Sequence, residues 1–303
     1  MWRRILDHWH RWPRWRRVAL AAVLVLAIIL VVASDSRMVI RQYEIDAQQI
    51  TAPIRIALVT DLHSCYYGKD QHKLIDAIDG QAPDLIVMAG DIFDDEMKDA
   101  NTERFLAGIA GRYPCYYVTG NHEYWSGAAD FATKMATLEK YGVTILDGAC
   151  ETVEIRGQIL DICGVEDPDV YTVRNDKKAD PQGYKKAKEE KLDVFQRQLE
   201  AVKAQTAEGH FTVLLSHRPE HFERYVACGY DLVLCGHAHG GQWRIPGLLN
   251  GLLAPDQGLF PKYAGGWYDQ DGTTMIVSRG LARESTPVPR FFNPPELVII
   301  TVK

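Results

Sequence analysis

The sequence predicts an α/β fold. From residue 54 onward, short apolar runs alternate with amphipathic stretches, which is the pattern of strands joined by crossover helices. The strands of one set are each followed by a polar or glycine-containing turn, which is where functional loops begin in such folds. The chain has 303 residues, of which 47% are hydrophobic and 24% are charged, as in proteins that bury a core. We therefore expect one large domain with an N-terminal appendage.

The expected elements follow from these runs. Apolar runs predict a first set of strands at 54–60, 84–89, 115–119, 212–216 and 231–235, and a second set at 144–146, 152–155, 159–163, 274–278 and 297–302. Helical spacing of apolar residues is found at 71–79, 102–110, 129–141 and 192–205. Residues 172–191 are highly charged and are interpreted as a solvated excursion that leads into a helix. Residues 240–272 are rich in glycine and aromatic residues and predict a long ordered loop.

The N-terminus, residues 1–36, has the composition of a membrane anchor. Residues 1–17 contain six Arg against one Asp, with tryptophans at positions 2, 9, 12 and 15, and residues 18–33 are continuously apolar. The apolar run is about 24 Å long as a helix, somewhat less than a hydrocarbon core of about 30 Å, so flanking residues would have to contribute. By the positive-inside rule, residues 37–303 lie outside the cytoplasm of a single-pass cell-membrane protein.

A cleaved signal peptide is the alternative for this segment. The length of the run, the small residues Val31 and Ala33, and the pair Arg16-Arg17 leave removal and twin-arginine export open. A buried core helix is disfavoured, because the flanking charge lies so strongly on one side. Cleavage would free the domain from the membrane, but it would place residues 37–303 in the same compartment.

Charge and cysteine content exclude other classes. The formal net charge is −6 although the N-terminus is basic, and the rest of the chain holds no comparable basic run, so nucleic acid is not an expected partner. Six cysteines are too sparse for a disulfide scaffold. We interpret Cys115, Cys163 and Cys235, which lie in apolar runs, as buried small hydrophobic residues.

Polar residues with metal-ligand chemistry follow the strands of the first set. They are Asp61, His63, Asp91, Asn121, His217, His237 and His239. Asp61, Asp91 and Asn121 are 30 residues apart, the length of one βαβ unit, so right-handed crossovers should bring them to the same sheet edge. In extended backbone, the side chains of residues two apart point the same way. The two residues of each pair, Asp61 with His63 and His237 with His239, can therefore bind the same metal ion.

The donor set indicates two metal ions. Imidazoles mixed with carboxylates and an amide oxygen suit Mn, Fe or Zn, with manganese preferred, and seven ligands are too many for one four-coordinate ion. Two ions that share a bridging carboxylate could hold a hydroxide at neutral pH and neutralise charge on a phosphoryl group. The sequence therefore predicts a dinuclear phosphoesterase that works by attack of a metal-bridging hydroxide.

The motifs resemble those of the calcineurin-like metallophosphoesterases. The matching residues are Asp61-x-His63, Gly90-Asp91, Gly120-Asn121-His122-Glu123, His217 and Gly236-His237-x-His239, and the segments GHAHGGQWRIPG, APDQGLFPKY and TMIVSRGL are similar to the bacterial membrane-anchored branch. The resemblance covers about residues 50–303 and implies a four-layer α/β/β/α sandwich with two mixed sheets. It implies that Asp61, His63, Asp91 and His239 hold one metal and that Asp91, Asn121, His217 and His237 hold the other. His122 would act catalytically at the leaving-group oxygen or stabilise the phosphoryl charge.

One departure bears on the substrate. Protein phosphatases of this family carry Arg shortly after the second motif, as Gly-Asp-x-x-Asp-Arg, whereas the sequence Gly90-Asp91-Ile92-Phe93-Asp94-Asp95 puts an acid there. We therefore expect a phosphodiester, which carries one negative charge fewer than a monoester. Arg218 and Arg279 are candidate substrate contacts, with surface or structural ion pairs as the alternative. Apolar residues in 243–263 offer a groove for a lipid, or merely pack their loop.

We therefore expect a membrane-tethered metal-dependent phosphodiesterase acting on a phosphodiester or pyrophosphate bond of a lipid or nucleotide-linked substrate. A phosphomonoesterase and a non-catalytic membrane-bound metal-binding adaptor are the alternatives.

Overall fold

Two six-stranded sheets form the centre of the protein, described here by a computed structural model of residues 12–173, 180–285 and 288–303. The first sheet has the order β1 (Val39–Ile45), β14 (Glu296–Val302), β2 (Ile54–Val59), β3 (Leu85–Ala89), β4 (Cys115–Val118) and β5 (Thr144–Ile145). The second has the order β12 (Gly266–Gln270), β13 (Thr273–Val277), β9 (Leu232–Cys235), β8 (Phe211–Leu215), β7 (Gln158–Gly164) and β6 (Cys150–Ile155). Both are mixed, because antiparallel pairings of β14 with β2, and of β13 with β12, adjoin parallel ones.

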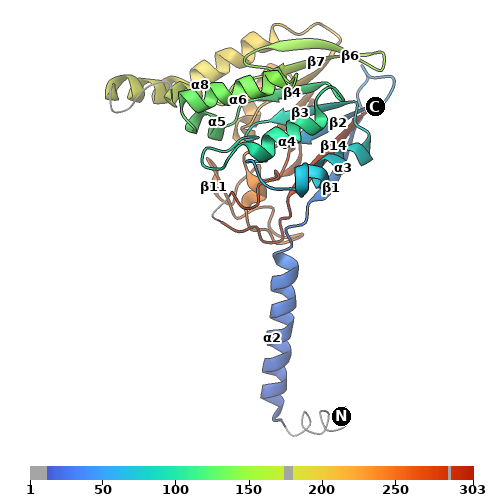
Figure 1. Cartoon of the computed structure of the whole chain (residues 1–303), viewed down its shortest axis with the longest axis vertical. Helices are drawn as coiled ribbons and strands as arrows, with labels where there is room; N and C mark the ends of the chain where they lie inside the picture. Colours follow the sequence, from blue (N-terminus) through green and yellow to red (C-terminus); the bar gives the residue numbers. More distant parts are fainter. Residues whose placement is uncertain (1–11, 174–179, 286–287) are drawn as a thin grey trace.

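Helices cover the outer faces of both sheets (Figure 1). The described helices are α2 (Arg14–Ala33), α3 (His72–Gln81), α4 (Ala100–Ile109), α5 (Asn121–Trp125), α6 (Ala128–Lys140), α7 (Val170–Val173), α8 (Pro181–Lys203) and α9 (Phe222–Cys228). Short 3-10 turns are found at Lys69–Gln71, Pro219–His221 and His239–Gly241, and a small hairpin joins β10 (Leu253–Ala254) to β11 (Gly258–Leu259).

Three hydrophobic clusters separate four layers. The central cluster lies between the sheets and includes Leu58, Val87 and Val213. A second packs the first sheet against α3, α4 and α6, and a third packs the second sheet against α8 and α9. Alternate residues of β2 divide between two clusters, with Ile56 and Leu58 facing the other sheet and Ala57 and Val59 facing helices, because successive strand residues point to opposite faces. The predicted α/β/β/α sandwich is confirmed.

The predicted strands of both sets appear within a few residues of their expected positions. The structure adds β1 and β12, which the sequence analysis did not predict, and places β10, β11 and β12 inside the segment expected to be a single loop. The long helix α8 begins at Pro181, inside the charged segment, where the Asp180 side chain caps it by accepting from the Gly183 N–H. Part of that segment, 174–179, lies outside the described residues.

The N-terminal helix α2 projects from the body (Figure 1). It has 20 residues, and an 18-residue window within it has a mean hydropathy of 2.5, with only 6% of that window buried. At 1.5 Å per residue the helix is about 30 Å long, because it begins at Arg14, four residues before the apolar run; residues that flank the run therefore contribute to its length, as expected. It is long and apolar enough to cross a membrane, a test that a signal sequence also passes. Trp2 and Trp9 lie outside the described residues.

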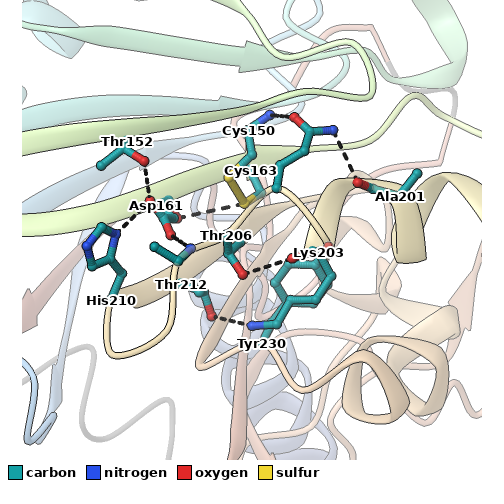
Figure 2. The surroundings of a disulfide bond; sticks show 12 residues. Cys150, Thr152, Asp161, Cys163, Ala201, Lys203, Thr206, His210, Thr212 and Tyr230 are labelled. Carbon is teal, nitrogen blue, oxygen red and sulfur yellow. Dashed lines mark hydrogen bonds and ion pairs between the residues drawn. A yellow bond between two sulfur atoms is a disulfide. The ribbon is translucent and has the colours of Figure 1, made fainter.

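A disulfide joins Cys150 to Cys163 across the antiparallel pair β6 and β7 (Figure 2). The two residues are direct partners in the strand register, which brings their side chains close enough to bond. The interpretation of Cys163 as merely a buried hydrophobic residue was therefore wrong. Cys115 and Cys235 are buried free thiols, as expected.

Candidate metal centre

All seven predicted ligands follow strands of the two sheets, and all are buried. Asp61 and His63 follow β2, Asp91 follows β3, Asn121 opens α5 after β4, His217 follows β8, and His237 and His239 follow β9. Strands β2, β3 and β4 are parallel neighbours, so their carboxyl ends meet at one edge of the first sheet. Strands β8 and β9 meet in the same way in the second sheet, and the two edges together enclose the cluster.

The ligand atoms form two groups that meet at Asp91. Asp61, His63 and His239 make one group and Asp91, His217 and His237 the other, with the donor atoms of each group within 4.8 Å of one another. Oδ2 of Asp91 lies 3.1 Å from Nε2 of His217 in its own group and 3.5 Å from Nε2 of His63 in the other. One carboxylate oxygen is therefore within reach of two centres.

The donor atoms have the character of a metal site. Asp61 Oδ2, His63 Nε2, Asp91 Oδ2, Asn121 Oδ1 and His239 Nδ1 are all buried and make no hydrogen bond. Leaving a buried polar atom without a partner costs about 1–3 kcal/mol, and more when it is charged. Five such atoms in one place are compensated if cations bind among them. The residues present therefore fit two divalent ions bound by nitrogen and oxygen ligands.

The backbone at these ligands adopts the left-handed region. The φ angles are 48° at Asp61, 46° at His63, 53° at Asp91, 66° at His237 and 45° at His239. The expectation that ligand pairs two apart meet through extended backbone was wrong, because both members of each pair have a positive φ angle. Non-glycine residues in this region are uncommon, and such strain concentrates at functional sites.

Two glycines make room for the carboxylates. A Cβ added at Gly120 would collide with the Asp91 carboxylate. A Cβ at Gly236 would lie 2.5 Å from Asp61 Oδ2. Both ligand carboxylates thus pack directly against the backbone of a neighbouring loop, and any larger residue would displace them.

Glu123 holds two of the ligand loops together, a role that the sequence analysis did not assign. Its buried carboxylate accepts hydrogen bonds from the backbone N–H groups of Asp91, Ile92 and Phe93 at 2.8–3.1 Å and from that of Gly120 at 2.8 Å. Burial, together with the nearby charge of Asp91, raises its pKa. A glutamate three residues after the start of a helix could have suggested the local contact with Gly120, but not the long-range ones.

His122 lies at the rim, beside the buried cluster. Its backbone N–H donates to Asp91 Oδ1 at 2.9 Å, and its ring Nδ1 is 2.5 Å from Asp95 Oδ1. Its ring meets that of His63 edge-on, with centroids 4.4 Å apart. His63 is itself oriented by Asp94, whose Oδ2 lies 2.9 Å from His63 Nδ1. Asp94 and Asp95 therefore each hold a histidine of the site, and Asp95 stands where the family's protein phosphatases carry arginine.

Opposite charges perturb the buried titratable groups. Burial alone would raise the pKa of Asp91, but the positive charges of His217 and His122 hold it well below its ordinary value. Burial alone would lower the pKa of His217, but Asp91 raises it to about 10. His237 behaves in the opposite way, because burial and the charge of Arg218 lower its pKa to about 3. Burial and the charge of His63 lower the pKa of His239 as well. The last two imidazoles are therefore neutral, the form in which histidine binds metals.

The two candidate substrate contacts are held in buried ion pairs. The Arg218 guanidinium is bidentate to Asp167, pairs with Asp169 at 3.2 Å, and contacts Asp256 and the His237 ring. Arg279 pairs with Glu296 at 2.6 Å. Direct contact of either arginine with a phosphate stays a prediction. Asp256, at the turn of the β10–β11 hairpin, was missed by the sequence analysis and lies 3.0 Å from His237 Nε2.

The other histidines lie away from this centre, where they are described. His72 is exposed, whereas His210 is half-buried with its Nδ1 3.1 Å from Asp161 (Figure 2). His221 is half-buried against Phe195, with ring centroids 5.1 Å apart. His8 and His10 lie outside the described residues.

Known proteins resemble this chain over most of its length. A family model described as calcineurin-like phosphoesterase matches residues 54–241. An uncharacterized metallophosphoesterase of Aquifex aeolicus is 30% identical over 87% of this chain and 91% of its own length. The phosphodiesterase YaeI of Escherichia coli is 26% identical over 64% of each chain. Among solved structures, a dimetal phosphatase from Danio rerio aligns with a TM-score of 0.48, at 13% identity, over 75% of this chain and 88% of that one.

The fold and the site define a metal-dependent phosphoester hydrolase. The chain belongs to the calcineurin-like phosphoesterase family.

Proposed function

We propose that this metallophosphoesterase is a membrane-tethered phosphodiesterase that hydrolyses a phosphodiester or pyrophosphate bond of a lipid or nucleotide-linked substrate. The observation that carries the proposal is the meeting of two ligand groups at one oxygen of Asp91, with His122 beside it. A site for two neighbouring cations suits in-line displacement at phosphorus, since both the attacking and the leaving oxygen need charge stabilisation.

Asp61, His63, Asp91 and His239 would hold one ion, and Asp91, Asn121, His217 and His237 would hold the second. When bound, two divalent ions supply Lewis acidity and lower the pKa of water at the site, with manganese the preferred ion. The protein side of the arrangement is a rigid frame. Hydrogen bonds from the backbone of His122 to Asp91 and of His237 to Asp61, each 2.9 Å, orient the carboxylates so that the other oxygen of each faces the centre.

His122 would serve the leaving group. Asp95 binds its Nδ1, which leaves the opposite ring nitrogen, Nε2, available to donate a proton or a hydrogen bond. The ring is about one-quarter exposed, so a substrate can reach it, whereas the predicted ligands beneath it are buried. A positioned imidazole of this kind contributes about 10²–10⁴-fold to the rate.

The acidic rim favours a diester over a monoester. Asp95 brings a carboxylate to the place where protein phosphatases of this family carry a cation, Asp94 precedes it, and both are engaged with histidines of the site. A monoester dianion would meet stronger repulsion there than a diester with a single charge. The similarity to a phosphodiesterase of Escherichia coli supports the same choice.

Three observations support an anchored domain, residues 37–303, on the outer side of the cell membrane, as in the bacterial membrane-anchored branch. The helix α2 is long enough to span a bilayer, and Arg14, Arg16 and Arg17 at its start favour a cytoplasmic N-terminus. The Cys150–Cys163 disulfide supports an oxidising compartment.

Hydrolysis by the full chain, purified in detergent and loaded with manganese, tests the proposal. Bis(p-nitrophenyl) phosphate and p-nitrophenyl phosphate would be compared for the wild type, Asp91→Asn and His122→Asn, with bound metal measured by mass spectrometry. We expect faster turnover of the diester, loss of both metal and turnover in Asp91→Asn, and retained metal with a much lower kcat in His122→Asn. Two bound metals without turnover of either substrate would contradict the proposal, and a preference for the monoester would reassign it as a phosphomonoesterase.

A further inference from the structure

An apolar surface lies where the metal-site loop leaves the body. It consists of Trp243, Leu253, Leu259, Phe260 and Val288, which we call the apolar platform. All five are exposed, and Leu259 and Phe260 are 67% and 68% exposed. Trp243, Leu253 and Val288 line one shallow cavity, and Leu253 pairs with Leu259 across the β10–β11 hairpin. Large apolar side chains gathered in this way mark a surface that contacts another apolar phase.

The platform adjoins the end of α2. The Trp243 indole N–H donates to the Pro289 carbonyl at 3.0 Å, and Pro289 lines a second cavity together with Ser34 and Ser36, which directly follow the helix. The N–H of Phe292 donates to the carbonyl of Ala33, the last residue of α2, at 2.7 Å. Figure 1 shows β11 on the half of the body from which α2 departs, with β6 and β7 at the opposite end. A bilayer crossed by α2 would therefore face the platform.

The same hairpin reaches the metal centre. Asp256, at its turn, contacts Arg218 and the predicted ligand His237, while Leu253 and Leu259 on its strands face outward. In the other direction, Trp243 lies only four residues after the predicted ligand His239. The β10–β11 hairpin therefore contacts the candidate metal centre at its turn and contributes to the apolar platform with its strands.

We propose that the apolar platform inserts into the interfacial region of the bilayer that α2 crosses and holds the metal centre against the lipid surface. The inference rests on the membrane tether of the proposed function. The tether supplies the reason to choose a bilayer over a protein partner, because α2 ends beside the platform and keeps it next to lipid. Trp243 with neighbouring aliphatic residues is the composition of an interfacial contact.

Spin-label depth measurements on the full chain test the insertion. Leu253→Cys and Leu259→Cys would each be labelled in a Cys228→Ser background, since Cys65, Cys115 and Cys235 are buried and Cys150 and Cys163 are bonded. Val23→Cys in α2 marks the bilayer, and Ile159→Cys, an exposed apolar position on β7, marks water. The protein is placed in nanodiscs of phosphatidylethanolamine and phosphatidylglycerol. The ratio of relaxation by oxygen to relaxation by a nickel chelate is then measured at each label.

We expect ratios at positions 253 and 259 to be severalfold above that at 159 and to approach that at 23. Equal ratios at 259 and 159, with a high ratio at 23, would overturn platform insertion and leave the tether in place. A low ratio at 23 would overturn the tether, and with it the inference. Protection of position 259 from both reagents would show a protein contact such as a second copy, and would also overturn it. Hydrolysis of the soluble diester, measured separately, reports on the enzyme and not on docking.

Discussion

The Asp256 carboxylate lies 3.0 Å from Nε2 of His237, while Nδ1 of the same imidazole faces His217 Nε2 at 3.2 Å. If Nδ1 is the atom that binds metal, Nε2 carries the proton and donates a hydrogen bond to Asp256. Arg218 Nη1, which lies 3.0 Å from the same Nε2, then donates to Asp256 as well. The hydrogen bond from His237 lowers the pKa of Asp256, so the carboxylate is charged at neutral pH. A carboxylate behind a metal-binding imidazole fixes its tautomer and raises its basicity.

Asp256→Asn should therefore weaken manganese binding by about 10- to 100-fold, the usual effect of removing such a carboxylate. Titration calorimetry on the metal-free full chain measures the affinity directly, without reference to turnover. Asp76→Asn, on the exposed face of α3, is the matched control and should leave the affinity unchanged. Equal affinities for the wild type and Asp256→Asn would show that the hairpin does not support the site.

Removal of the Glu123 side chain should destabilise the ligand loops. Glu123→Ala leaves four buried backbone N–H groups without an acceptor, and we expect a loss of about 3–5 kcal/mol of unfolding free energy. Glu123→Gln keeps one acceptor oxygen and should lose less. Urea denaturation measures both, with Glu139→Ala on the exposed side of α6 expected to stay within about 0.5 kcal/mol of the wild type. A small effect of Glu123→Ala would refute the bridging role.

The disulfide should contribute to stability. It closes a loop between residues 13 apart, for which constraint of the unfolded chain predicts about 2–4 kcal/mol. We expect the Cys150→Ser, Cys163→Ser double variant to lose this amount of unfolding free energy and therefore to unfold at a lower urea concentration than the wild type. Reductant should shift the wild type to the same midpoint and leave the double variant unchanged. Coincident wild-type and variant midpoints without reductant would contradict this prediction.

His221 should make stability depend on pH. Burial and the charges of Arg218 and Arg224 lower its pKa to about 4, against about 6.5 in the unfolded chain. Because His221 binds a proton more weakly in the folded protein, the unfolded state binds more protons between these two pKa values. The contribution of His221 to the free energy of unfolding is therefore fully present above about pH 6.5. It falls by roughly 2–3 kcal/mol as the pH drops toward 4, since each unit of pKa difference corresponds to about 1.4 kcal/mol.

His221→Gln should flatten the pH dependence of the unfolding free energy between about pH 4 and 6.5. Urea denaturation at several pH values gives the slope for the wild type and the variant. His72→Gln, at an exposed position on α3, should retain the wild-type slope. An unchanged slope in His221→Gln would assign the dependence to other groups.

The elements that follow a local sequence pattern, such as an apolar run that ends at a glycine, could be predicted from the sequence. Buried strands such as β3 are uniformly apolar and end at a glycine followed by a ligand, so both the strand and Asp91 were visible. Strand β1 was not predicted, because as an edge strand it is largely exposed and its VIRQYEI sequence has no buried run. The pairing of Cys150 with Cys163 depends on the β6–β7 register, which spacing alone does not reveal.

The supporting residues of the site were harder to predict than its ligands. Asp256 meets His237 only because the β10–β11 hairpin folds back over the loop after β9, and no local pattern near residue 256 indicates this. The left-handed backbone at Asp61 and His63 was also not visible, since isolated residues of these types rarely adopt it. Long-range packing decides both features.

The connection between α2 and the body limits the distance between the catalytic domain and the end of this helix. Five residues, 34–38, separate the end of α2 from β1, a length that spans at most about 17 Å. The hydrogen bond from Phe292 to Ala33 also ties the end of α2 to the segment before β14. If α2 is the proposed membrane tether and the substrate is lipid-linked, so short a connection means that enzyme and substrate meet by lateral diffusion in two dimensions. Its working rate would then follow the number of substrate molecules per unit of membrane area, and dilution of the surrounding fluid would leave that rate unchanged.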